Sequence, residues 1–105
     1  MRSIEINIDN PLNNINILID MKTNKMIFNN QTLQISEDKI KELLRIIRTW
    51  SNTYGKSSKN IDSEKFLIKI IEKNNIDMIK GDGTYPPNYY ELKQWIGDLN
   101  DWRNL

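Results

Sequence analysis

The sequence predicts an α+β fold: a two-layer sandwich in which an antiparallel sheet of about six strands carries two helices on one face. Three observations predict it. Apolar and polar residues alternate in the first third of the chain, apolar residues at helical spacing follow, and the order of strands and then a helix recurs in the second half. The expected order is β-β-β-β-α-β-β-α. At 105 residues the whole chain, 1–105, is expected to form a single domain.

Four short strands are expected before the first helix. In SIEINID, Ile4, Ile6 and Ile8 alternate with polar residues, which is the period of a half-buried strand. INILIDM repeats the alternation, and MIFNN and TLQIS add two shorter strands. Because the connections are short and polar, the strands should pair antiparallel, since a parallel crossover needs a longer link.

Ser36 marks the change to helical spacing. It is a candidate N-cap, and acidic residues follow it in the first turn, where the helix dipole favours them. The apolar stripe that comes next has helical spacing: Ile40, Leu43, Leu44, Ile47, Trp50 and Tyr54. Gly55 is expected to end the helix, and the polar segment 55–64 is expected to be a flexible loop.

The second half begins with a predicted hairpin and ends with a second helix. EKFLIKIIEK and IDMIKG are expected to pair around an Asn-Asn turn. Gly81 and Gly83 should end the strand, and Asn88 with Glu91 resembles a capping box. The final apolar stripe again has helical spacing: Tyr89, Leu92, Trp95, Ile96, Leu99 and Trp102. We interpret the segment GDGTYPPNYYELKQWIGDL mainly as a structural joint between strand and helix.

Composition excludes several classes of function. The chain has no cysteine and no histidine, so disulfides, the usual ligands of zinc, haem and copper, and the commonest general base are all missing. The carboxylates fall at predicted turns, caps and solvent faces, and their spacing singles out no catalytic pair. We therefore expect no enzymatic activity, no cofactor and no metal.

Charge and hydropathy indicate a cytoplasmic protein. The net charge is +1, which fits neither a strongly basic nucleic-acid binder nor an acidic DNA mimic. No apolar run approaches the roughly 20 residues of a membrane span. The first ten residues, MRSIEINIDN, contain no apolar core of a signal peptide. No membrane partner is expected.

Nucleic-acid binding is an alternative that depends on one helix face and the loop after it. Five cations there could contact phosphate: Lys41, Arg45, Arg48, Lys56 and Lys59. Glu42 interrupts this face, and no aromatic platform accompanies it. A solvated helix face is the preferred interpretation.

Two surfaces are candidates for contact with another protein. By alternation, several apolar residues are expected on the sheet face opposite the isoleucine rows: Leu18, Ile27, Leu67, Ile71 and Ile79. The C-terminal segment has more aromatic residues than one helix needs for packing, and acidic residues near a helix C-terminus, where negative charge is unfavourable. The candidates there are Tyr85, Tyr90, Asp98, Asp101 and Trp102.

These observations favour a small protein that binds and inhibits another protein. Bacterial immunity proteins and phage-encoded inhibitors are similar in size and in their mixed α and β plan. The first hypothesis is an immunity protein that neutralises a cognate bacterial toxin. The alternative is a phage-encoded inhibitor of a host defence nuclease, of the anti-CRISPR type. A nucleic-acid-binding accessory protein is the third hypothesis.

Overall fold

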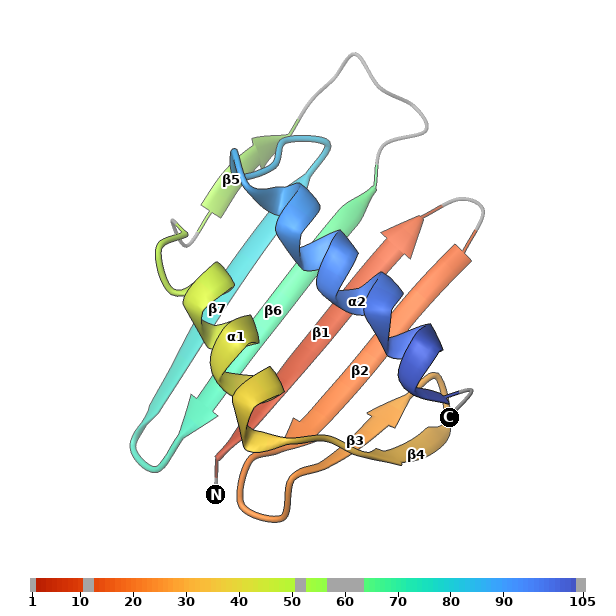
Figure 1. Ribbon diagram of the computed structural model, residues 1–105. Helices are drawn as coiled ribbons and strands as arrows, with labels where there is room; N and C mark the ends of the chain where they lie inside the picture. The colour runs from red at the N-terminus through yellow and green to blue at the C-terminus, as the bar shows by residue number, and fades with distance from the viewer. Residues whose placement is uncertain (1, 11–12, 51–52, 57–63, 104–105) are drawn as a thin grey trace.

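In the computed structural model, two helices lie across one face of a sheet (Figure 1). The structure describes residues 2–10, 13–50, 53–56 and 64–103. The strands are β1 (Ser3–Asn10), β2 (Asn13–Asp20), β3 (Lys25–Phe28), β4 (Gln31–Gln34), β5 (Thr53–Lys56), β6 (Lys65–Glu72) and β7 (Asn75–Asp82). The helices are α1 (Glu37–Ile47) and α2 (Tyr89–Arg103). The predicted α+β order is confirmed, and the short strand β5 is added to it.

The strand order in the described part of the sheet is β4-β3-β2-β1-β6-β7-β5. Strand β1 lies in the middle, between its sequence neighbour β2 and the distant strand β6, and pairs antiparallel with both. The meander β1–β4 builds one half of the sheet and the hairpin β6–β7 most of the other. Strand β5, which the sequence did not predict, runs parallel to β7 at the edge of the sheet, with Thr53 opposite Lys80.

The core lies between the sheet and the helices and is built largely of isoleucine. Buried isoleucines stand opposite one another across the three central strands: Ile4 with Ile19 and Ile70, and Ile6 with Ile17 and Ile68. Leu43 and Ile47 of α1 and Leu92 and Leu99 of α2 are buried in the same cluster. Since the chain contains no valine, isoleucine supplies the β-branched side chains that suit a pleated surface.

Helix α1 begins where the sequence predicts and ends earlier. The Ser36 hydroxyl accepts a hydrogen bond of 3.3 Å from the Lys39 backbone N–H, as an N-cap should. The helix stops at Ile47, so the predicted continuation to Tyr54 and the stop at Gly55 are wrong; both residues belong to β5. Of the predicted loop 55–64, residues 57–63 lie outside the described part.

The position of Trp50 explains why the sequence predicts a longer helix than the structure contains. Its backbone N–H donates to the Ile47 carbonyl at 3.2 Å, a tight turn that keeps the indole on the buried side of α1. The ring packs edge-on against Phe66, with the ring centroids 6.0 Å apart. Trp50 therefore matches the helical spacing, although it lies beyond the helix.

Asn88 joins the beginning of α2 to the end of α1. Trp50 Nε1 donates to Asn88 Oδ1 at 2.6 Å, and Asn88 Nδ2 donates to the Ile46 carbonyl at 3.4 Å and to Glu91 Oε2 at 2.9 Å. Asn88 and Glu91 thus pair through their side chains, while the acceptor oxygen of Asn88 serves Trp50. These contacts agree with the interpretation of residues 81–99 as a structural joint between a strand and a helix.

Candidate protein-binding surface

The helices cover one face of the sheet and leave the other face, here called the open face, without a covering element in the described part of the chain (Figure 1). Leu18 of β2 and Ile27 of β3 are directly opposite each other on this face. Their exposed fractions are 40% and 43%. Strand residues alternate between faces, so the neighbours of Leu18 in β2, Ile17 and Ile19, point into the core.

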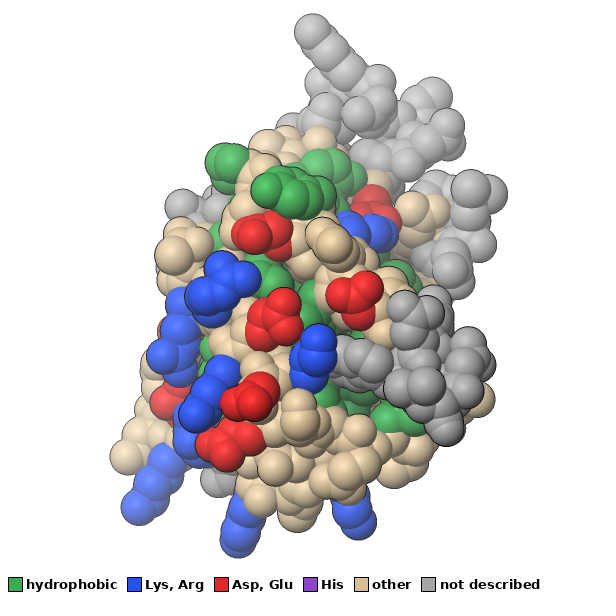
Figure 2. All heavy atoms as spheres, in the orientation of Figure 1, with side chains coloured by type: hydrophobic (Ala, Val, Ile, Leu, Met, Phe, Trp, Pro, Cys, Tyr) green, Lys and Arg blue, Asp and Glu red, His purple; other side chains and the backbone are tan. Residues whose placement is uncertain are grey.

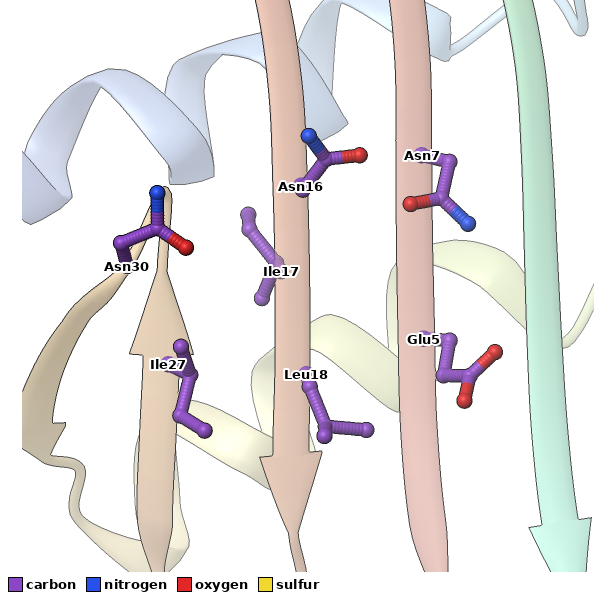
Figure 3. Close-up of a pocket in the computed structure, with 7 residues that line it drawn as sticks. All are labelled: Glu5, Asn7, Asn16, Ile17, Leu18, Ile27 and Asn30. Carbon is purple, nitrogen blue, oxygen red and sulfur yellow. The ribbon is translucent and has the colours of Figure 1, made fainter.

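A shallow hollow of about 270 Å³ surrounds this apolar pair. Figure 3 shows the side chains of Leu18 and Ile27 on neighbouring strands, with the amide of Asn30 above Ile27. The amides of Asn7 and Asn16 extend toward each other between β1 and β2. The hollow therefore has an apolar centre and a border that can both donate and accept hydrogen bonds.

A second apolar group lies on the same face at β6 and β7. Ile76 and Met78 are exposed, and Ile71 stands opposite Ile76. Between the two apolar groups, Glu5 of β1 is opposite Lys69 of β6, which in turn is opposite Met78. The open face is thus apolar on both sides of two central charged residues, Glu5 and Lys69.

The prediction that Ile79 lies on the open face is wrong. Its exposed fraction is 4%, and it stands opposite Ile68 in the core. The physical reason is the hairpin turn: two residues between β6 and β7 pair odd-numbered positions of β7 with even-numbered positions of β6, whose side chains are buried. Applied to the sequence, the same rule places the even-numbered residues Ile76 and Met78 on the open face, which the sequence analysis missed.

The other sheet candidates lie on the open face. Leu18 is exposed as predicted, and Leu67 is half-buried between Asn7 and Lys80 in the register of the sheet. Because polar residues flank Leu67 on both neighbouring strands, it is not continuous with the Leu18–Ile27 pair. The stronger apolar feature is therefore the pair itself.

The aromatic and acidic candidates at α2 have different surroundings. Tyr90 is 67% exposed, and Asp98 is exposed as well. Tyr85 is half-buried and stacks on Tyr89 with ring centroids 4.6 Å apart. Its hydroxyl accepts from the Glu64 N–H and donates to the Glu64 carbonyl, each at 2.9 Å, so it holds the chain before β6 in place.

Two more candidates, Asp101 and Trp102, lie in the last turn of α2, and their side chains are outside the described part. Their role as partner contacts stays a prediction. Of the five candidates in the C-terminal segment, Tyr90 and Asp98 are therefore the ones described as exposed.

The cations that suggested nucleic-acid binding are interspersed with acids. Lys41 lies 3.8 Å from Glu37, and Arg48 lies 3.9 Å from Glu72. Arg45 borders a small hollow that it shares with three carboxylates: Glu42, Glu91 and Asp98. The side chain of Lys56 in β5 lies outside the described part, as does all of Lys59. The described cations do not form a continuous phosphate-binding stripe.

The most perturbed titratable groups surround Glu64, under α2. Its carboxylate accepts hydrogen bonds from Lys93 Nζ at 2.8 Å, from the Tyr89 hydroxyl and from Asn10 Nδ2 at 3.0 Å. Burial opposes the charged form, but these donors outweigh it and hold the pKa of Glu64 below its ordinary value. Burial and the neighbouring carboxylate raise the pKa of Tyr89. These groups satisfy one another, which is the pattern of a structural contact.

Glu64→Gln should lower the free energy of unfolding at pH 7 by about 1–2 kcal/mol, because the ionised carboxylate stabilises the fold. A lowered folded pKa contributes stability that is present above the unfolded pKa, near 4.5, and is lost as the pH falls through the folded pKa. Urea denaturation at pH values from about 6 to 3 should therefore show that the free energy of unfolding falls less steeply with decreasing pH in the variant than in the wild type. The control is Glu37→Gln, in an exposed ion pair, which should follow the wild type. Equal slopes for Glu64→Gln and the wild type would contradict this role.

Comparisons of the chain with protein families, with curated proteins and with solved structures found no match. Neither helix, over its described residues, has the length and apolar character to cross a bilayer. Among the described residues, no three acidic side chains come together as a possible metal site. The geometry of the chain itself is the basis of the functional proposal.

Proposed function

We propose that this protein binds another protein through the open face of its sheet and inhibits it without catalysis. One observation carries the proposal: Leu18 and Ile27 lie opposite each other, each about two-fifths exposed, within a polar border on a face that the described helices leave uncovered. Contiguous exposed apolar groups with a polar border are typical of protein interaction sites.

The physical chemistry of the open face supports tight binding by few residues. Leu18 and Ile27 are held on central and adjoining strands, so little conformational entropy is lost when a partner covers them. Removing such side chains from water contributes about 1 kcal/mol or more for each. The surrounding asparagines, including Asn7 and Asn16, can exchange water for hydrogen bonds to the partner.

The proposal extends to the kind of protein that is bound. We favour an immunity protein that acts in the cytoplasm on a cognate bacterial toxin, and the alternative is a phage-encoded inhibitor of a host defence nuclease. The internal satisfaction of Glu64, Tyr89 and Lys93 supports a non-catalytic role, because these groups are engaged with one another. A neighbouring toxin gene would favour the first partner and a prophage setting the second.

Replacing Leu18 or Ile27 with threonine should weaken partner binding about tenfold each while leaving the melting temperature nearly unchanged. Threonine is β-branched, which strands favour, and it removes most of the apolar surface of either side chain. Partners retained by the immobilised wild type are identified by mass spectrometry, and the affinity of the purified partner is then measured by calorimetry.

The matched control for this experiment is Tyr90→Ala, which removes an exposed apolar group from α2 on the other side of the molecule. Its affinity should equal that of the wild type. The opposite pattern, with loss of binding for Tyr90→Ala and full binding for Leu18→Thr and Ile27→Thr, would move the interface to the C-terminal helix.

A further inference from the structure

A groove of about 490 Å³ lies beside α1, away from the open face. It runs along α1 from Glu37 to Arg48, beside the turn that joins β2 to β3 and Arg2, which directly precedes β1. In Figure 1 these segments meet at the lower end of the molecule. The groove falls within the size range of ligand-binding clefts, about 300–1,000 Å³.

Four cationic side chains and one carboxylate line this groove: Arg2, Lys22, Lys41, Arg48 and Glu37. Figure 2 shows the Lys and Arg side chains gathered along the left and lower margins of the helical face. Lys41 and Arg48 have exposed carboxylate partners 3.8 Å and 3.9 Å away, and such exposed pairs are weak. In the described part of the chain, Arg2 and Lys22 form no ion pair.

One further acid lies close to the groove. Asp20 accepts a hydrogen bond of 2.9 Å from the Lys22 backbone N–H, and this bond, with the nearby Lys22 charge, keeps the pKa of Asp20 below its ordinary value. Asp20 does not line the groove itself. The lining residues therefore remain predominantly positive.

The lining between the cations includes apolar side chains. Ile40 and Leu44 of α1 and Met21 of the β2–β3 turn all border the groove. Ile40 is buried in the core, while Met21 and Leu44 are half-buried and pack against it. An unbranched methionine can adapt to side chains of different shape. The groove thus offers one apolar contact within a cationic border.

We infer that this groove binds an acidic peptide segment of a partner protein, with carboxylates on either side of one large apolar side chain. Arg2 and Arg48 can each hold a carboxylate through two parallel hydrogen bonds, and Lys22 and Lys41 add point charges. The apolar side chain would cover Met21 and Leu44. The inference does not depend on the open face, which is a separate surface.

Nucleic acid fits the same cations less well. Proteins that bind single-stranded nucleic acid typically place cations along a continuous path for the phosphates and aromatic side chains on which the bases stack. The residues that line the groove include no aromatic ring, and they do include the carboxylate of Glu37. An apolar contact beside the charges matches a peptide side chain better than a sugar-phosphate backbone.

The test is fluorescence polarisation with the labelled peptide Glu-Asp-Glu-Leu-Glu-Asp-Glu. The double variant Arg2→Gln with Lys22→Gln should bind this peptide about tenfold more weakly than the wild type. The matched control is Lys65→Gln with Lys80→Gln, which removes two exposed cations from the open face and should change the affinity less than about twofold. Circular dichroism verifies that both double variants are folded.

Two further probes test the contribution of the apolar side chain to the affinity and the preference for peptide over nucleic acid. A peptide with serine in place of the leucine should bind the wild type several-fold more weakly, because it cannot cover Met21 and Leu44. Oligothymidylate of equal charge should bind more weakly than the acidic peptide.

Three results would overturn the inference. The first is the absence of peptide binding to the wild type. The second is an equal loss of affinity in the Lys65 and Lys80 control, which would indicate general electrostatic attraction. The third is tighter binding of oligothymidylate than of the peptide, which would assign the groove to nucleic acid.

Discussion

Replacing Trp95 with alanine should lower the free energy of unfolding by about 3–5 kcal/mol. Trp95 is almost fully buried in α2 and packs in the core cluster. Its Nε1 donates to the Lys39 carbonyl of α1 at 3.1 Å, so the side chain ties the two helices together as well as filling the core. Alanine leaves a cavity that the surrounding isoleucines and leucines cannot fill without strain.

Two variants divide this effect into its parts. Trp95→Phe keeps much of the buried ring and loses the hydrogen bond, so its cost should be about half or less of the alanine cost. Tyr90→Ala changes an exposed aromatic residue on the same helix and should leave the unfolding free energy within about 0.5 kcal/mol of the wild type. Urea denaturation of the three variants measures this, and similar midpoints for Trp95→Ala and Tyr90→Ala would contradict the packing.

Replacing Gly81 with alanine should cost about 3 kcal/mol, the upper part of the usual range for overpacking. A Cβ atom at Gly81 would lie 2.5 Å from Phe66 Cε1 and 2.6 Å from the Thr84 carbonyl oxygen. Phe66 stands directly opposite Gly81 on β6, and its ring contacts Trp50, Tyr85 and Tyr89. Since the carbonyl is backbone and the ring is packed on several sides, neither neighbour can move freely.

Gly97 provides the matched control in the same chain. It lies in α2 and is exposed, and a Cβ atom added there would meet nothing within 4 Å outside its own helix. Gly97→Ala should therefore stabilise the protein by about 0.5–1 kcal/mol, because alanine has the higher helix propensity. The two glycine substitutions should thus shift the denaturation midpoint in opposite directions. If both substitutions shifted the denaturation midpoint in the same direction and by the same amount, the close contacts predicted for a Cβ atom at Gly81 would be contradicted.

Secondary structure could be predicted from the sequence wherever a local pattern had a single structural solution. Alternating isoleucines in β1 and β2 placed both strands and their buried face, because a strand has only two faces. Ser36 placed the beginning of α1, since the N-cap hydroxyl bonds within its own first turn. Leu18 and Ile27 could be assigned to the open face for the same local reason, so the central pair of the candidate surface was predictable.

Features that depend on distant partners required the three-dimensional arrangement of the chain. Trp50 matches the helical period but lies beyond the end of α1, where it contacts Phe66 and Asn88 from the second half of the chain. The pattern of β7 is apolar on both sides and does not choose a face, so the face on which Ile79 lies follows from its pairing with β6 through the two-residue turn. The groove beside α1 likewise requires Arg2, the β2–β3 turn and the helix to meet in space. Their separation along the chain leaves no periodic signal in the sequence.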